Sequence, residues 1–136
     1  MGLRRKAREA AIQMLYQMDM AAVDAPVAIR LYWGTLAGND GAREFADDLV
    51  LGLAAASERV DALIRQVSKH WRLERMARVD RNIIRLAVYE LAERPEIPRR
   101  VTLNEAIELA KRFGDENSPA FVNGVLDRIA DAVQKE

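Results

Sequence analysis

The sequence contains no cysteine, which excludes a disulfide framework and thiolate chemistry. His70 is its single histidine, and one histidine without cysteine forms neither a zinc site nor a nucleophile–base pair. A glycine-rich phosphate loop is missing. No apolar run approaches the roughly 20 residues that span a membrane, and the basic N-terminus lacks the apolar core of a signal peptide. We therefore expect a cytoplasmic protein without catalytic residues, metal ligands or a cofactor.

What remains is the composition of a globular chain: 50% of the 136 residues are hydrophobic and 31% are charged. Period-two alternation, which is typical of strands, is missing, whereas apolar residues recur at helical spacing along the chain. The first such stripe consists of Leu3, Ala7, Ala10, Ala11, Met14, Leu15 and Met18. The pattern predicts an all-α fold with six or seven helices and short loops.

Local signals predict where the middle helices begin and end. A short helix is expected from about Pro26 to Leu36, and a long one carries an apolar stripe from Phe45 to about Trp71. The residues after Asp80 are apolar on nearly every side, which predicts a buried central helix with Asp80 as its N-cap.

Two more helices follow this central one. Thr102 and Glu105 have the spacing of a capping box, and Gly114 is the expected C-terminal stop of the helix that they open. Ser118, which precedes a proline, is the expected cap of the last helix. Gly124 falls inside that helix, where we expect a point of close packing rather than a turn.

The net charge of zero hides an uneven distribution. Residues 1–12 hold four bases and one acid, 13–63 hold three bases and eight acids, and 64–136 hold fourteen bases and twelve acids. Residues 65–100 alone carry ten bases and five acids. Because local potential governs the binding of a polyanion more than the sum does, nucleic acid remains a possible partner.

Four bases crowd the start of the first helix: Arg4, Arg5, Lys6 and Arg8. A base there is unfavourable by about 0.3–1 kcal/mol because a helix N-terminus carries partial positive charge. The same place combines backbone N–H donors with cationic side chains, which together attract phosphate. From charge alone, an RNA contact and a solubilising, partly frayed N-terminus are equally open.

Three stretches carry a resemblance to a known family. They are "RRKAREAAIQMLYQMD" at 4–19, "RVDRNIIRLAVYEL" at 78–91 and "NEAIELAKRFGDENSPAFVNGVLDRIA" at 104–130. The third is long, nearly gap-free and very specific, whereas the region of about 20–77 matches only in helical pattern. In this order and spacing, the stretches resemble the NusB family of bacterial transcription antitermination factors.

The resemblance implies a fold of two packed helical bundles, about residues 1–77 and 78–136. It also implies a partner, NusE, a small-subunit ribosomal protein that forms a heterodimer with members of the family. The heterodimer binds the boxA element of single-stranded nascent RNA. It then helps the RNA polymerase antitermination complex to read through terminators, notably on ribosomal RNA operons. Whether the free protein is a monomer or a homodimer is left open.

RNA contacts are expected from two groups of residues. The basic N-terminus supplies Arg4, Arg5, Lys6 and Arg8. A loop and helix start within 111–123 supply Lys111, Arg112, Asn117, Ser118 and Phe121. Cations just before a helix N-terminus form an anion site, and an aromatic ring can stack on an unpaired base.

Three members of this expected interface have alternatives or depart from the family pattern. Core packing against Val125 is the alternative to base stacking for Phe121. Arg85 either joins the RNA patch or is a lone solvated charge on the buried helix. Asn117 stands where the family usually carries an acid, and the loss of that negative charge is expected to favour RNA binding.

The partner protein requires further residues. Tyr16, Glu74 and Asp80 match positions that the family uses to hold NusE, and an aromatic anchor flanked by carboxylates suits a basic ribosomal protein. These residues are expected on a different face from the RNA. The alternatives are that Tyr16 is a rim residue of the core and that Asp80 is a helix cap.

Two other classes of function stay open. A protein-interaction adaptor without an RNA role of its own is disfavoured by the basic N-terminus. Domains that resemble NusB also occur fused to RNA methyltransferases. A chain of 136 residues leaves no room for a cofactor-binding α/β domain, so that function requires a second polypeptide.

Overall fold

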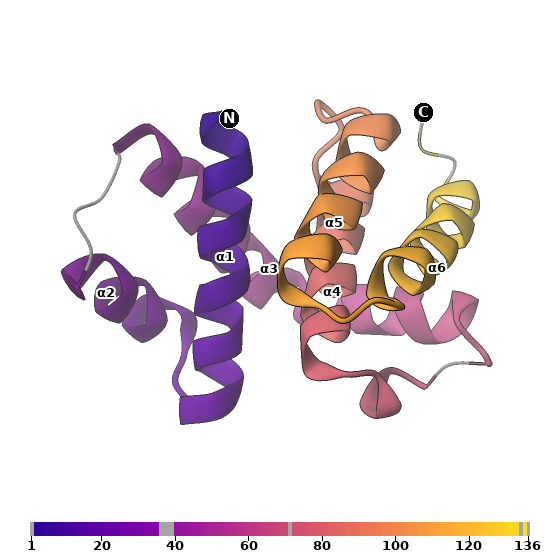
Figure 1. Ribbon diagram of the computed structural model, residues 1–136, viewed down its shortest axis with the longest axis horizontal. Coiled ribbons are helices and arrows are strands. Elements are labelled where there is room, and N and C mark those ends of the chain that lie inside the picture. Colours follow the sequence, from indigo (N-terminus) through magenta and orange to yellow (C-terminus); the bar gives the residue numbers. More distant parts are fainter. Residues whose placement is uncertain (1, 36–39, 71, 134, 136) are drawn as a thin grey trace. The chain divides into compact units, whose positions relative to one another are not determined.

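The computed structural model describes residues 2–35, 40–70, 72–133 and 135. These residues form six α-helices and one short 3₁₀ helix, and no strand occurs among them (Figure 1). The elements are α1 (Leu3–Ala21), α2 (Ala25–Thr35), α3 (Asp40–Val67), η1 (Leu73–Arg75), α4 (Arg78–Glu93), α5 (Arg99–Phe113) and α6 (Ser118–Ala132). The prediction of an all-α fold is confirmed, while Leu36 and Trp71 lie outside the described residues.

The chain divides into an N-terminal unit, residues 1–55, and a C-terminal unit, residues 56–136. The division falls within α3, earlier than the expected boundary near residue 77. Ion pairs connect the end of α3 with the C-terminal unit. Arg59 Nη2 lies 3.2 Å from Glu93 Oε1, and Arg85 Nε lies 2.8 Å from Asp61 Oδ1, so both pairs join α3 to α4.

In the N-terminal unit, α1 packs against α2. The predicted stripe of α1 is buried at Ala7, Ala10, Ala11 and Met14, whereas Leu3 at its start is 50% exposed. The start of α2 is capped from outside the helix, because Asp24 Oδ1 accepts a hydrogen bond from the backbone N–H of Val27 at 3.0 Å.

The centre of the C-terminal unit is α4, against which α5 and α6 pack (Figure 1). As the sequence predicted, most of α4 is buried, including Ile83, Ile84 and Leu86. Two of its buried residues, Asp80 and Glu90, are charged. Glu90 is only 1% exposed, and its Oε1 accepts a hydrogen bond of 2.9 Å from the hydroxyl of Thr102 on α5.

This hydrogen bond corrects the predicted capping box. The N-cap of α5 is Pro98, so Thr102 lies inside the helix and contacts α4 instead of capping its own helix. The predicted N-cap role of Asp80 is also wrong, because α4 has Ala77 at that position and Asp80 in its first turn. A negative charge in the first turn still interacts favourably with the helix dipole.

The predictions for Gly114 and Gly124 have different outcomes. Gly114 is the C-cap of α5, as predicted. A Cβ at Gly114 would lie 2.5 Å from Ser118 Cβ and 2.9 Å from the carbonyl oxygen of Ala110, so only glycine fits there. The close-packing role predicted for Gly124 is wrong, because a Cβ there would meet no heavy atom of the described residues within 4 Å.

Replacing Thr102 with valine tests the contact between α4 and α5. The valine variant loses the hydroxyl but keeps the shape of the side chain, which leaves a buried carboxylate oxygen without this donor. We expect the free energy of unfolding in urea to fall by about 1–3 kcal/mol. Thr102→Ser keeps the hydroxyl and should retain more of the stability. Equal stability of the wild type and the valine variant would contradict this role.

Candidate functional site

A hollow of about 600 Å³ lies in the C-terminal unit. Its walls come from the segment between α3 and α4, the loop between α5 and α6, and the first turn of α6. We call it the basic pocket, and it is lined by Lys69, His70, Arg72, Arg75, Met76, Ala77, Asp80, Asp115, Asn117 and Phe121. The structure therefore brings together three of the predicted site residues: Asp80, Asn117 and Phe121.

Three cations of the basic pocket were missed by the residue-level predictions: Lys69, Arg72 and Arg75. They lie between α3 and α4, where the sequence matches the family only in helical pattern. The excess of bases in residues 65–100 was the signal that could have found them. Together with the half-buried ring of Phe121, they place positive charge beside an aromatic surface.

Asp80 lies close to residues that were predicted to contact RNA. It was predicted to contact the partner protein, yet it lines the same pocket as Asn117 and Phe121. It is 9% exposed, and its Oδ1 is buried without a hydrogen-bond partner among the described residues. A carboxylate oxygen of this kind is costly to leave unsatisfied, so the pocket favours a bound group that donates a hydrogen bond.

The loop between α5 and α6 is organised by Asp115. Its Oδ1 accepts hydrogen bonds from the backbone N–H of Asn117 at 2.8 Å and of Ser118 at 3.1 Å. The hydroxyl of Ser118 in turn accepts from the backbone N–H of Asp115 at 3.0 Å. Ser118 is only 2% exposed and is the first residue of α6. Its predicted cap position is therefore one residue off, and its hydroxyl holds the loop rather than pointing to solvent.

Phe121 is half-buried. Besides the basic pocket, it lines a second hollow of about 180 Å³. We call this second one the Gly124 hollow, and its lining residues are Val67, Ser68, Ala120, Phe121, Gly124, Val125 and Arg128. The buried neighbour Val125 forms part of its floor.

Lys111 and Arg112 stand in the last turn of α5, where cations interact favourably with the helix dipole. Both are exposed, but neither lines the basic pocket. Lys111 Nζ lies 3.3 Å from Glu108 Oε2, and the guanidinium carbon of Arg112 lies 5.5 Å from the centre of the Phe113 ring. They add positive charge to the start of the loop that Asp115 organises.

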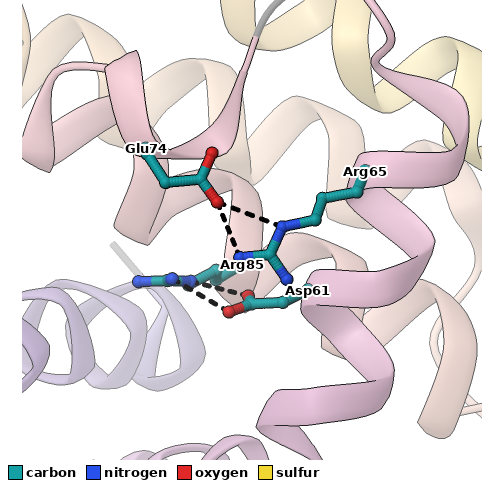
Figure 2. Close-up of polar contacts among 4 residues, drawn as sticks. All are labelled: Asp61, Arg65, Glu74 and Arg85. Carbon is teal, nitrogen blue, oxygen red and sulfur yellow. Dashed lines mark hydrogen bonds and ion pairs between the residues drawn. The ribbon is translucent and has the colours of Figure 1, made fainter.

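Arg85 is neither free nor fully solvated. Its Nε and Nη2 donate to the two carboxylate oxygens of Asp61 at 2.8 and 3.0 Å, and its side chain is 25% exposed (Figure 2). The alternative of a lone solvated charge is therefore wrong for Arg85. An RNA phosphate would have to compete with a two-point ion pair or use the remaining N–H groups of the guanidinium.

The predicted partner residue Glu74 forms an ion pair with Arg65, which belongs to the same helix as Asp61 (Figure 2). Its Oε1 accepts hydrogen bonds from Arg65 at 2.7 and 3.1 Å, which lowers the pKa of the Glu74 carboxyl. The same contact raises the pKa of Arg65. Glu74 thus stays ionised and exposed, as a contact to a basic partner requires.

In the N-terminal unit, the four predicted cations differ in exposure. Arg4 and Lys6 are exposed, and Arg5 is half-buried. Arg8, which was also predicted to contact RNA, is only 3% exposed and is therefore not accessible to it in this structure. The guanidinium carbons of Arg4 and Arg8 lie 4.5 and 5.4 Å from the centre of the Phe45 ring, where cation–π attraction offsets part of the unfavourable helix dipole.

Tyr16 also belongs to the N-terminal unit and is 45% exposed. It is therefore not a buried core residue, and its ring is accessible to a partner. Among the described residues, no group of three or more histidine, cysteine, aspartate or glutamate side chains could hold a metal ion. None of the described helices is long and apolar enough to cross a membrane.

Comparison with known proteins decides the family. The sequence profile described as "NusB family" matches residues 5–131. The chain belongs to the NusB family. This membership places it among non-enzymatic transcription antitermination factors.

Similar NusB proteins come from several bacteria. The transcription antitermination protein NusB of Sorangium cellulosum is 53% identical over 131 residues, which cover 96% of this chain and 94% of the relative. The protein of the same name from Bacillus cereus is 49% identical over 131 residues, covering 96% of this chain and 98% of the relative.

Solved structures of NusB proteins have the same fold. T. maritima NusB is 40% identical and has a TM-score of 0.83, with 94% of this chain and 90% of that chain covered. A crystal structure of the antitermination factors NusB and NusE in complex with dsRNA gives a chain that is 30% identical, with a TM-score of 0.79 and coverage of 96% and 97%.

The cap at Asp115 can be tested by mutation. Asp115→Ala removes the acceptor of two backbone N–H groups. We therefore expect the free energy of unfolding, measured by thermal unfolding, to fall by about 0.5–2 kcal/mol. Glu116→Ala is the matched control, because it removes the same charge from the neighbouring exposed position. A similar loss in both variants would mean that charge, rather than the cap, accounts for the effect.

Proposed function

We propose that this NusB-family chain pairs with NusE, binds boxA RNA, and promotes read-through by RNA polymerase, notably on ribosomal RNA operons. The observation that carries the proposal is the basic pocket, which combines Lys69, Arg72 and Arg75 with the half-buried ring of Phe121. Cations along a groove and an aromatic platform are the two features with which proteins hold single-stranded nucleic acid.

Further residues support an RNA ligand. Arg4 and Lys6 are exposed at the start of α1, where the helix dipole adds to their attraction for phosphate. Asn117 lines the basic pocket with a neutral side chain, so the positive potential there is not reduced as an acid would reduce it. Lys111 and Arg112 raise the potential at the neighbouring helix end.

For the protein partner, the supporting features are the exposed ring of Tyr16 and the ionised carboxylate of Glu74. An aromatic anchor and an acid fit a basic ribosomal protein. Asp80 differs from them, because it lies in the basic pocket and is mostly buried. We propose that Asp80 contacts NusE only through its small exposed part.

Titration of labelled boxA-like RNA, with and without NusE and at two salt concentrations, tests the proposal. We expect RNA binding to weaken as the salt concentration rises, because phosphate contacts release counterions. We also expect RNA binding to be tighter when NusE is present. Binding of NusE without any measurable affinity for RNA, alone or in the complex, would instead identify a protein-interaction adaptor.

Charge reversal at the N-terminus tests whether the bases at the start of α1 contact RNA. Arg8 is excluded because it is buried, so the variant is Arg4→Glu with Lys6→Glu. We expect weaker RNA binding and a salt dependence whose log–log slope is shallower by about 0.7 for each lost phosphate contact.

The control for this variant carries Arg30→Glu and Arg100→Glu, two exposed positions outside the predicted interface. It changes the net charge by the same amount. Equal losses of RNA affinity in the two variants would show that overall charge, and not the start of α1, is responsible.

Asp61 is expected to reduce the availability of Arg85 for RNA. Asp61→Asn removes the competing carboxylate and should tighten RNA binding roughly fivefold. Two unit charges 4 Å apart in water interact by about 1 kcal/mol, and this energy corresponds to about a fivefold change in affinity. The gain should disappear when Arg85→Gln is also present. An equal gain with and without Arg85 would assign the effect to net charge alone.

A further inference from the structure

A third hollow, of about 300 Å³, lies at the end of α3 beside η1. We call it the Lys69 hollow, and its lining residues are Arg65, Ser68, Lys69, Arg72, Leu73 and Glu74. Two of them, Lys69 and Arg72, also line the basic pocket, so the two hollows adjoin. Three cations face a single acid here, and this excess of positive charge attracts a phosphate group.

The acid of the Lys69 hollow holds one of its cations. The Nε and Nη2 atoms of Arg65 donate to Glu74 Oε1 at 3.1 and 2.7 Å (Figure 2). The side chains of Arg65 and Glu74 are 55% and 62% exposed. Water and salt screen an ion pair that is so open, and such pairs contribute little to stability. A ligand can therefore replace either side of this pair without disturbing the fold.

Once separated from Glu74, Arg65 has one further acid nearby, Asp61, which lies one turn earlier on α3. Asp61 is already engaged, because its two carboxylate oxygens accept hydrogen bonds from Arg85 at 2.8 and 3.0 Å (Figure 2). The guanidinium of Arg65 would then be available to an anion in the Lys69 hollow.

The ion pair between Arg65 and Glu74 thus connects two kinds of ligand. A basic protein requires the carboxylate of Glu74, whereas a phosphate group requires the guanidinium of Arg65. The ligand that binds first has to break the ion pair, and the second ligand finds it already broken. By thermodynamic linkage, each ligand then raises the affinity for the other by the same factor.

We propose that the Lys69 hollow binds a phosphate of the RNA strand that leaves the basic pocket, and that it is completed when a basic partner takes Glu74 and releases Arg65. In the free protein, Lys69 and Arg72 attract the phosphate, and Arg65 becomes its third cationic contact in the complex. The inference rests on the proposed function and extends it, because it assigns a phosphate site and a physical reason for tighter RNA binding with NusE.

Neutral substitution of Glu74 tests the release of Arg65. Glu74→Gln frees Arg65 without a partner, so titration of boxA-like RNA should show about 1.4- to 5-fold tighter binding by the protein alone, the factor that corresponds to an exposed ion pair. The ratio of the Kd for RNA without NusE to the Kd with saturating NusE should fall by the same factor. The gain should be lost when Arg65→Gln is also present.

Substitution of Arg65 should act on the two ligands in opposite directions. Arg65→Gln releases Glu74, so NusE should bind about 1.4- to 5-fold more tightly when RNA is absent. In the complex with NusE, the same variant should bind RNA more weakly. The log–log salt dependence should be shallower by about 0.7, because one phosphate contact is lost.

The ion pair between Arg59 and Glu93 provides the matched controls, because it is also exposed and lies outside the Lys69 hollow and the basic pocket. Glu93→Gln and Arg59→Gln change the net charge by the same amounts as the two test variants. Neither control should alter the affinity for RNA, the affinity for NusE or the ratio of the two Kd values. All four variants should melt close to the temperature of the wild type.

The outcomes separate this inference from the proposed function. If the wild type binds no RNA, alone or with NusE, the proposed function fails. If the wild type binds RNA but Glu74→Gln gains no more affinity than Glu93→Gln, the phosphate site is overturned. An equal gain with and without Arg65 also overturns it, because net charge then accounts for the effect. An unchanged NusE ratio in Glu74→Gln overturns the link between the two ligands.

Discussion

The need to bury α4 governs the arrangement of the C-terminal unit. Residues such as Ile83, Ile84 and Leu86 leave this helix with almost no face that water can cover, so α5 and α6 pack against it. The end of α3 is joined to it by ion pairs. The connecting segments are short and have to lie at the helix ends, and two of these segments line the basic pocket. The site is thus formed by loops that a rigid core positions.

The placement of charge follows a second constraint. Bases that resemble one another in the sequence have different surroundings in the structure. Arg8 is buried and lies near Phe45, and Arg85 is held at two points by Asp61. Lys69 and Arg72, in contrast, lie at the wall of an open pocket. The capacity to bind a polyanion therefore depends on which cations are accessible rather than buried or held in an ion pair, and charge counts along a sequence do not contain this information.

The helices could be predicted because helical periodicity and a fully apolar segment are local patterns. Their exact starts could not, since the caps are decided by contacts across the fold: Thr102 binds Glu90 on α4, and Ala77 precedes α4 without a side-chain cap. The grouping of Asn117 and Phe121 followed from one continuous stretch of sequence. Asp80 joins them through space, across segments far apart in the chain, and periodicity does not report such a contact.

The start of α1 has a thermodynamic consequence. Its first turn, which the structure describes in full, contains no acidic residue, and the N-cap Gly2 offers no side-chain oxygen. An anion bound there would act as the missing cap, because it supplies both the acceptor and the negative charge that the helix end lacks. Anion binding and helix formation at this end would then be thermodynamically coupled. The affinity of this end for phosphate would fall on warming in parallel with the helicity of the first turn, and amide protons there would exchange more slowly in the bound state.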